Sequence, residues 1–139
     1  MGTQKQAFLI LSICIISACS KSTASNHQAI TKEAQDFRKY ATAICLGTSF
    51  PEAAVKSDAN RSANAYLGNV DLKAYESLRG QLKGWKPSRF VTKNGPQAAI
   101  ARCMEFSESD VVAKVFQQFD PCKNQEAWLD ETEFKTQCK

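Results

Sequence analysis

The sequence is poor in the residues that most often carry enzyme chemistry. Its 139 residues include one histidine, His27, which lies in a polar stretch near the N-terminus. A Ser-His or Cys-His hydrolase needs an imidazole beside its nucleophile, and this position does not offer one. No glycine-rich phosphate loop, paired-histidine motif or calcium-loop spacing occurs. Carboxylate pairs such as Glu105 and Glu108 leave a glycosidase open by count alone, but we interpret them as surface acids. We predict that the protein is not an enzyme and binds no cofactor.

Further absences exclude a zinc site, a membrane span and nucleic-acid binding. The six cysteines include no Cys-x-x-Cys pair, the short spacing that structural zinc sites use. The one long apolar run, residues 7–16, is about half of the ~20 residues that a membrane-spanning helix needs. The formal net charge of +4 is too small to indicate binding to nucleic acid. We therefore expect no metal and no nucleic-acid partner.

The pattern of residues at the N-terminus predicts a secretory leader. Lys5 precedes the apolar run, and small residues then lead into Cys19, the order typical of a signal peptide. The tetrapeptide Ile16-Ser-Ala-Cys19 resembles the lipobox of bacterial lipoproteins, in which the cysteine is acylated and becomes the mature N-terminus. Ser20 after it, in place of Asp, indicates sorting to the outer membrane. The alternative is a plain signal peptide cleaved near Ala18 or Ala24.

Either leader places the mature chain outside the cytoplasm, which decides how the cysteines are interpreted. We expect a signal peptide and lipidated cysteine over residues 1–19, a polar tether over 20–26 and one domain over 27–139. Four cysteines then remain, which an oxidising compartment would pair into two disulfides with three possible connectivities. We predict Cys45–Cys103, because it joins the apolar faces of two helices, and Cys122–Cys138, which brackets the C-terminal tail.

Apolar residues recur at helical spacing through most of the domain. We expect an all-α fold, a compact bundle of about five short helices followed by the disulfide-bracketed tail. The expected helices are residues 28–46, 52–67, 72–83, 97–106 and 107–119.

Several details of these helices follow from single residues. Gly47 is placed to end the first helix, and Ser57-Asp58 would allow the second to be split in two. The third helix begins after Asp71, and Ser107 to Asp110 has the spacing of a capping box for the fifth.

Other expectations concern burial. The buried faces are expected to include Leu72, Tyr75, Leu78 and Leu82 on the third helix and Ile100, Cys103 and Met104 on the fourth, with Trp128, Leu129 and Phe134 anchoring the tail.

Charge is distributed unevenly along the chain. Residues 77–104 carry six cations and no acid, whereas residues 105–139 carry eight acids against four lysines. One end of the fold is therefore expected to be basic and another acidic, although such asymmetry often reflects only solvated faces. The cations are Arg79, Lys83, Lys86, Arg89, Lys93 and Arg102.

Three segments carry a resemblance to a known family. Asn60-Arg-Ser-Ala-Asn-Ala-Tyr66, then Leu72-Lys-Ala-Tyr75, then Ala101-Arg-Cys-Met-Glu-Phe-Ser107 resemble, in order and spacing, the type VI secretion amidase immunity proteins. The resemblance runs from about residue 37 to residue 119. The lipobox and the tail after residue 121 depart from the pattern.

This resemblance implies a function that composition does not. Such proteins protect a bacterium from peptidoglycan amidases that sister cells inject into the periplasm. The toxins resemble papain-like endopeptidases and cut the peptide stem with a Cys-His pair. The immunity protein is an all-α homodimer that plugs the toxin's substrate groove with a helix of one subunit and a loop of the other.

By position, the resemblance points to the helix over 72–82 and the loop over 85–95 as the effector-binding elements. For Trp85 and Phe90 a place in the protein's own core is an equal alternative, and for Tyr66 and Tyr75 the core is the favoured location. The candidate effector-binding residues are Tyr75, Arg79, Trp85, Lys86, Arg89, Phe90, Lys93, Asn94 and Gly95.

We thus expect a periplasmic immunity protein, held at the outer membrane through lipid on Cys19, whose partner is a secreted amidase. Two other functions stay open: a general envelope lipoprotein with a structural or assembly role, and an envelope hydrolase of unrecognised type. An upstream gene for a small Cys-His amidase would favour the first.

Overall fold

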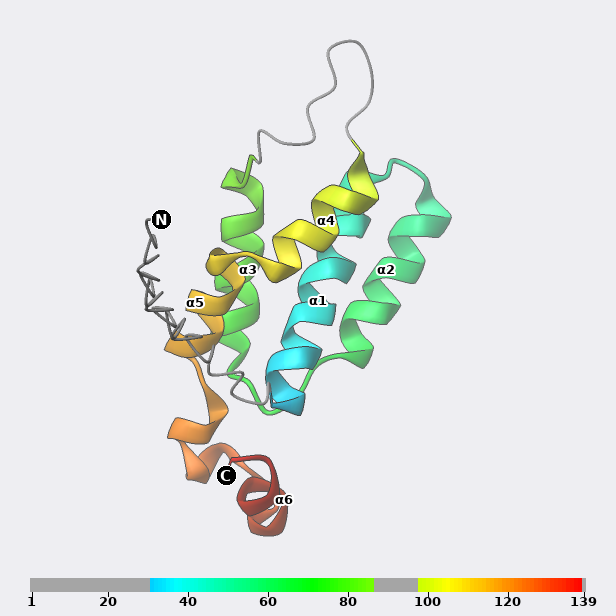
Figure 1. Ribbon diagram of the computed structural model, residues 1–139. Coiled ribbons are helices and arrows are strands. Elements are labelled where there is room, and N and C mark those ends of the chain that lie inside the picture. The colour runs from blue at the N-terminus through cyan, green and yellow to red at the C-terminus, as the bar shows by residue number, and fades with distance from the viewer. Residues whose placement is uncertain (1–30, 87–97, 139) are drawn as a thin grey trace, which may run out of the picture.

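The computed structural model describes residues 31–86 and 98–138, and over these residues the chain is all-α, with no strand. The described residues form six α-helices, with two 3-10 turns before the last helix (Figure 1). The all-α bundle predicted from the apolar spacing is thereby confirmed. The elements are α1 (Lys32–Ser49), α2 (Ala53–Ala65), α3 (Leu72–Gly84), α4 (Ala99–Glu108), α5 (Asp110–Gln118), η2 (Pro121–Lys123), η3 (Gln125–Ala127) and α6 (Glu131–Gln137).

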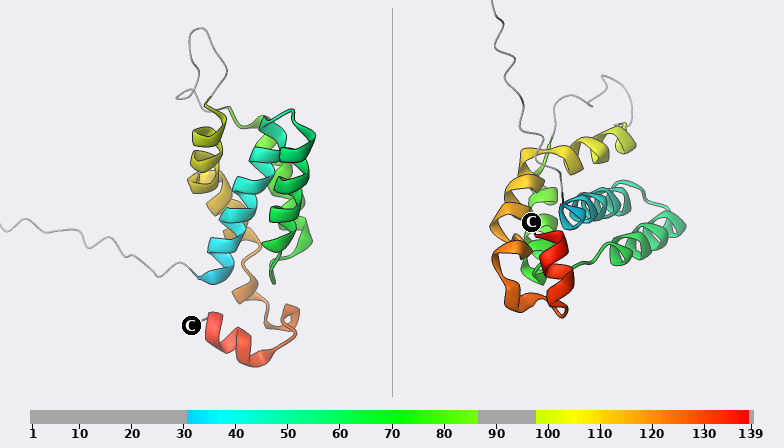
Figure 2. Two further views of the ribbon diagram at one scale, coloured as in Figure 1. Left: turned by 90° about the vertical axis from the view of Figure 1, so that its right-hand side faces the viewer. Right: turned by 60° about the horizontal axis from the view of Figure 1, so that its bottom comes forward.

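Helix α1 lies at the centre of the bundle. It packs most extensively against α2 and α4, and α3 packs against α5 (Figure 2). The Thr31 hydroxyl accepts a hydrogen bond from the Ala34 amide at 3.2 Å and so caps the start of α1. Phe37, Ala41 and Cys45 then recur every four residues and are almost fully buried, which gives the central helix one continuous inward stripe.

The core gathers apolar side chains from all five bundle helices. Its largest fully buried members are Phe37, Leu78, Phe106 and Val112. Each side chain of this size contributes about 1.5–3 kcal/mol when removed from water. The remaining core residues are Tyr40, Ala41, Ala43, Ile44, Cys45, Ala63, Val70, Ala74, Tyr75, Leu82, Cys103 and Val115.

Both predicted disulfides are confirmed. Cys45 of α1 and Cys103 of α4 are bonded, with Cα atoms 5.4 Å apart, and both residues are fully buried. Cys122 and Cys138 are bonded at the two ends of the tail, with Cα atoms 5.2 Å apart. The first bridge ties the central helix to α4 across the core, and the second closes only the tail.

The limit expected for the first helix is wrong, and the possible division of the second helix does not occur. Helix α1 continues through Gly47 to Ser49 and stops before Pro51, whose ring disfavours helix in the residue before it. Gly47 serves packing instead: a Cβ built there would lie 3.2 Å from the Cβ of Ala59 on α2. Helix α2 runs unbroken from Ala53 to Ala65, so Ser57-Asp58 does not divide it.

The junction of α4 and α5 also differs from its prediction. Ser107 belongs to α4, where its hydroxyl donates to the Met104 carbonyl at 2.7 Å. The N-cap of α5 is Ser109, which makes no side-chain capping bond. The capping box expected from Ser107 to Asp110 therefore does not form, because the preceding helix extends through Ser107.

Three residues predicted to face the core face solvent. Leu72 is 70% exposed, Ile100 is 62% exposed and Met104 is 60% exposed. Leu72 is the first residue of α3. Ile100 and Met104 are four residues apart and so share a face of α4, while Cys103 and Phe106 on another face are buried.

The tail forms a small core of its own. Trp128 is buried, its indole Nε1 donates to the Pro121 carbonyl at 3.0 Å, and its ring meets that of Phe134 edge-on at 5.8 Å. Leu129, expected to be a third anchor, is fully exposed. Figure 1 shows α6 at the end of the molecule where α1 begins.

Candidate functional site

The end of α3 and the start of α4 lie at the opposite end of the bundle (Figure 1). Residues from these two helix ends and from α1 line a cleft there. It has a volume of 460 Å³, within the range of ligand and peptide pockets. We call it the basic cleft. Its lining residues are Ile44 and Thr48 of α1, Arg79, Leu82 and Lys83 of α3, Trp85 and Lys86 of the segment after α3, and Arg102 of α4.

The floor of the basic cleft is apolar and fixed by the core. Ile44 is 3% exposed and Leu82 is 8% exposed, so both side chains are held by their neighbours in the bundle. Trp85 is half-buried and packs on Phe106 of α4, with ring centroids 5.2 Å apart. An aromatic side chain held in this way presents contact area without having to be ordered on binding.

Four cations surround this floor, and the described part of the lining includes no acid. The Arg79 Nε donates to the Tyr40 hydroxyl at 2.9 Å, and its guanidinium lies 5.6 Å from the centroid of the Tyr40 ring. Arg102 donates from a terminal nitrogen to the Ser49 hydroxyl at 3.0 Å. Within residues 31–86 and 98–138, Arg79, Lys83 and Lys86 form no ion pair. Arg79, Lys83 and Lys86 therefore give the cleft positive charge that no ion pair within the described residues compensates.

The sequence analysis predicted some of the residues that line the basic cleft as binding candidates and missed others. Arg79, Trp85 and Lys86 were candidates and do line the basic cleft. Arg89, Phe90, Lys93, Asn94 and Gly95 lie outside the described residues. Lys83 and Arg102 were counted among the six cations but not named as candidates. Ile44 and Thr48 were not found, because helical periodicity assigns Ile44 to the core and carries no signal for Thr48.

Tyr75, also a candidate, lies in the core at 4% exposure. Its hydroxyl accepts a hydrogen bond from the Gly68 amide at 3.0 Å, and its ring packs edge-on against Tyr40 at 4.6 Å. Burial raises the pKa of Tyr75 above its usual value, with the Gly68 hydrogen bond acting in the opposite direction. These contacts give Tyr75 a structural role, in line with the favoured expectation for it.

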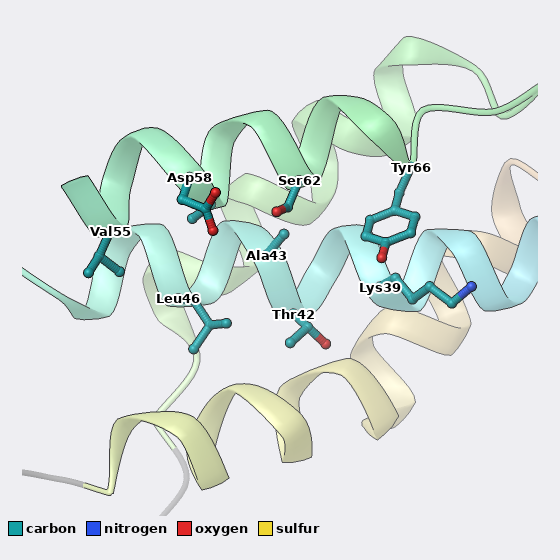
Figure 3. Close-up of a pocket in the computed structure, with 9 residues that line it drawn as sticks. Lys39, Thr42, Ala43, Leu46, Val55, Asp58, Ser62 and Tyr66 are labelled. Atoms are coloured by element: carbon teal, nitrogen blue, oxygen red, sulfur yellow. The ribbon is translucent and has the colours of Figure 1, made fainter. Parts of the chain in front are cut away.

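A second depression, a groove of 290 Å³, runs between α1 and α2 (Figure 3). It mixes charges of both signs, and Lys39 there is already engaged by Asp36 at 2.9 Å and by the Tyr66 ring at 5.3 Å. It therefore offers less charge selectivity than the basic cleft. Its lining residues are Lys39, Thr42, Ala43, Leu46, Val55, Asp58, Ala59, Ser62 and Tyr66.

Neither depression has the parts of a catalytic site. Their described linings contain no histidine and no cysteine, and the described residues hold no cluster of His, Cys, Asp and Glu suited to a metal ion. Among the helices described, none is both long and apolar enough to span a bilayer. In the basic cleft, a rigid apolar floor is surrounded by a cationic rim, which consists of Arg79, Lys83, Lys86 and Arg102. Such an arrangement suits binding of another molecule.

The profile of the Tai4 family, described as type VI secretion system (T6SS), amidase immunity protein, matches residues 35–116. That range begins in α1 and ends in α5, so it covers the bundle and the described part of the basic cleft, and leaves the tail outside. No individual curated protein matches the chain.

Proposed function

The chain belongs to the Tai4 family of type VI secretion amidase immunity proteins, and from this premise we propose that it binds one secreted peptidoglycan amidase and blocks its substrate groove. The observation that carries the proposal is the family match over residues 35–116, which run from α1 into α5. An immunity protein acts as an inhibitor, so the function needs a complementary surface and no reaction of its own. The absence of a histidine from both described depressions is compatible with such a role.

The blocking surface that we propose combines α3 with residues 85–95. An amidase must keep its groove open to reach the wall, so a segment of the immunity protein can fill the groove without chemistry. The basic cleft supports this assignment, because Arg79, Trp85 and Lys86 from the candidate set line it together. Tyr75 is left out of the proposed surface, because its hydroxyl and ring are used inside the bundle.

We further propose that the chain acts in the periplasm as a lipoprotein. Residues 1–19 would be the signal peptide with the lipidated Cys19, residues 20–26 the tether and residues 27–139 the immunity domain. Two disulfides in the domain fit an oxidising compartment. Replacing Cys19 by Ser should abolish fatty-acid labelling and move the protein from the outer-membrane fraction to the soluble periplasm. Unchanged fractionation with no label in the wild-type chain would favour the plain signal peptide.

We also propose that the active form is a homodimer, in which a helix of one subunit and the 85–95 segment of the other meet one amidase. Light scattering on the purified chain, alone and mixed with the amidase, measures both assemblies. A monomer that inhibits fully would contradict the dimer while leaving the inhibition in place.

The central test is protection. A candidate Cys-His amidase is exported to the periplasm of a bacterial host that produces the full chain or an empty control. We expect the control cells to lyse and the cells that produce the chain to survive. In a separate assay, the purified chain should inhibit wall hydrolysis by the amidase, and the inhibition should be complete at a fixed molar ratio. Release of muropeptides by the chain alone would overturn the proposal. Failure of the chain to bind any amidase that is encoded by a neighbouring gene would also overturn it.

A further inference from the structure

We propose that the basic cleft receives an acidic segment of the amidase, one that places carboxylates against the cationic rim and an apolar side chain on the floor. This inference rests on the proposed function and adds to it the chemistry that selects the partner. It is argued from the lining residues that the structure describes.

The rim favours carboxylates. Arg79 is oriented by the Tyr40 hydroxyl through its Nε, and Arg102 is held by Ser49. An arginine already fixed in place loses less freedom when it binds a carboxylate, and its planar group can do so with two hydrogen bonds. Lys83 and Lys86 are exposed at the edge and add attraction at longer range, which speeds encounter with an acidic partner.

The floor favours one apolar side chain between those carboxylates. Ile44, Leu82 and the half-buried Trp85 give an apolar surface surrounded by charge. Interface residues that contribute most to affinity are enriched in Trp and Arg and lie in well-packed pockets surrounded by polar contacts. A purely polar ligand such as phosphate would leave this apolar surface without a contact.

The size and charge of the molecule argue for a short protein segment. A volume of 460 Å³ accommodates a small group of side chains and is too small for a nucleic-acid duplex. The tail at the other end of the bundle holds Glu126, Asp130, Glu131 and Glu133 against three lysines, so its charge is opposite in sign to that of the cleft. The tail of a second copy is the competing occupant, since it is also acidic and exposes Leu129.

The test compares two charge-reversal variants with the same net change. Lys83→Glu/Lys86→Glu alters the cleft, and Lys56→Glu/Lys114→Glu alters exposed lysines on α2 and α5. Affinity of each full chain for the amidase is measured by calorimetry at low and at high salt, with thermal unfolding as a check of folding. We expect the cleft variant to lose affinity by on the order of 10- to 100-fold and to lose most of its salt dependence, and the control to stay within about 3-fold of wild type.

Equal affinities for the two variants, with both folded, would overturn the inference while leaving inhibition by the wild-type chain intact. If wild type binds no amidase, the proposed function fails and the inference fails with it. Self-association of the wild-type chain that the cleft variant abolishes would assign the cleft to the tail of a second copy, which also overturns the proposal. A Lys substitution in an acidic segment of the amidase that restores binding to the cleft variant would confirm the contact directly.

Discussion

The turn between α2 and α3 depends on a single buried carboxyl group. Glu33 of α1 is 3% exposed and accepts hydrogen bonds from the Asn69 backbone amide at 3.2 Å and from its side-chain amide at 3.3 Å. The Gly68 amide donates to the Tyr75 hydroxyl at 3.0 Å. These bonds satisfy polar groups that burial would otherwise make costly, and they fix where α3 begins relative to α1.

A methyl group at Gly68 should break this arrangement. In Gly68→Ala the new Cβ would overlap the Glu33 carboxyl group, so we expect a loss of about 2 kcal/mol in the free energy of unfolding. Gly80→Ala is the matched control, because its Cβ would meet nothing within 4 Å and it lies inside α3. The control should gain about 0.5–1 kcal/mol. Urea unfolding of both variants checks the prediction, and equal effects would contradict it.

Tyr75 should make stability depend on alkaline pH. Burial raises the pKa of Tyr75 in the folded protein, whereas in the unfolded chain it is near the ordinary value of about 10. The folded state therefore holds this proton more tightly, and the resulting stability is complete below pH ~10 and lost as pH rises through the raised pKa. Urea unfolding between pH 8 and 11 should show a steeper decline for wild type than for Tyr75→Phe. Parallel declines would show that Tyr75 is not the group responsible.

At the scale of elements, the two disulfides have different consequences because they join different things. Cys45–Cys103 links the central helix to α4 across 58 residues, and Cys122–Cys138 closes 16 residues of tail. In the chain-entropy account, loops of these sizes correspond to about 4 and about 3 kcal/mol. Only the first lies within the bundle that carries the basic cleft.

Removing each bridge separately should expose this difference. We expect Cys45→Ala/Cys103→Ala to lower the unfolding free energy of the bundle by about 4 kcal/mol and to weaken protection against the amidase. Cys122→Ala/Cys138→Ala should loosen α6 and leave the main unfolding transition nearly unchanged. Thermal unfolding followed by circular dichroism, with the protection assay alongside, measures both. A main transition lowered equally by the two pairs would contradict the separation.

At the scale of the whole molecule, the basic cleft and the C-terminal tail lie at opposite ends of the bundle. The basic cleft includes Thr48 near the end of α1, whereas α6 lies at the end of the molecule where α1 begins (Figure 1). The tail has its own buried Trp128 and its own disulfide, and among the described elements α6 shares no extensive interface with the bundle helices. The family match also stops within α5, so the tail lies outside the matched range.

Deletion of residues 122–139 should therefore spare both folding and inhibition. We expect the main unfolding temperature to shift by a few degrees at most, since little of the bundle core is exposed, and inhibition of the amidase to stay within about 3-fold of wild type. Calorimetry and the wall-hydrolysis assay check the two parts. Loss of inhibition in a folded deletion variant would place the tail in the binding surface.

The sequence by itself determined the all-α class, the approximate helices, the family and the cysteine pairing. Helical periodicity and capping are local properties, and Asp71 caps α3 at the Lys73 amide as its position predicts. The pairing also followed from the sequence, because Cys45 and Cys103 lie on apolar helix faces and two buried faces are expected to meet.

Only the tertiary structure decided which faces meet and where the surface opens. Ile100 and Met104 carry the apolar signal of a buried face, yet α4 turns them to solvent. Gly47, a helix terminator by sequence, instead lets α2 approach α1. The basic cleft draws on α1, α3 and α4, residues as far apart as Ile44 and Arg102. A local pattern sets the period of each helix, but its direction in the bundle depends on how the other helices fill the shared core.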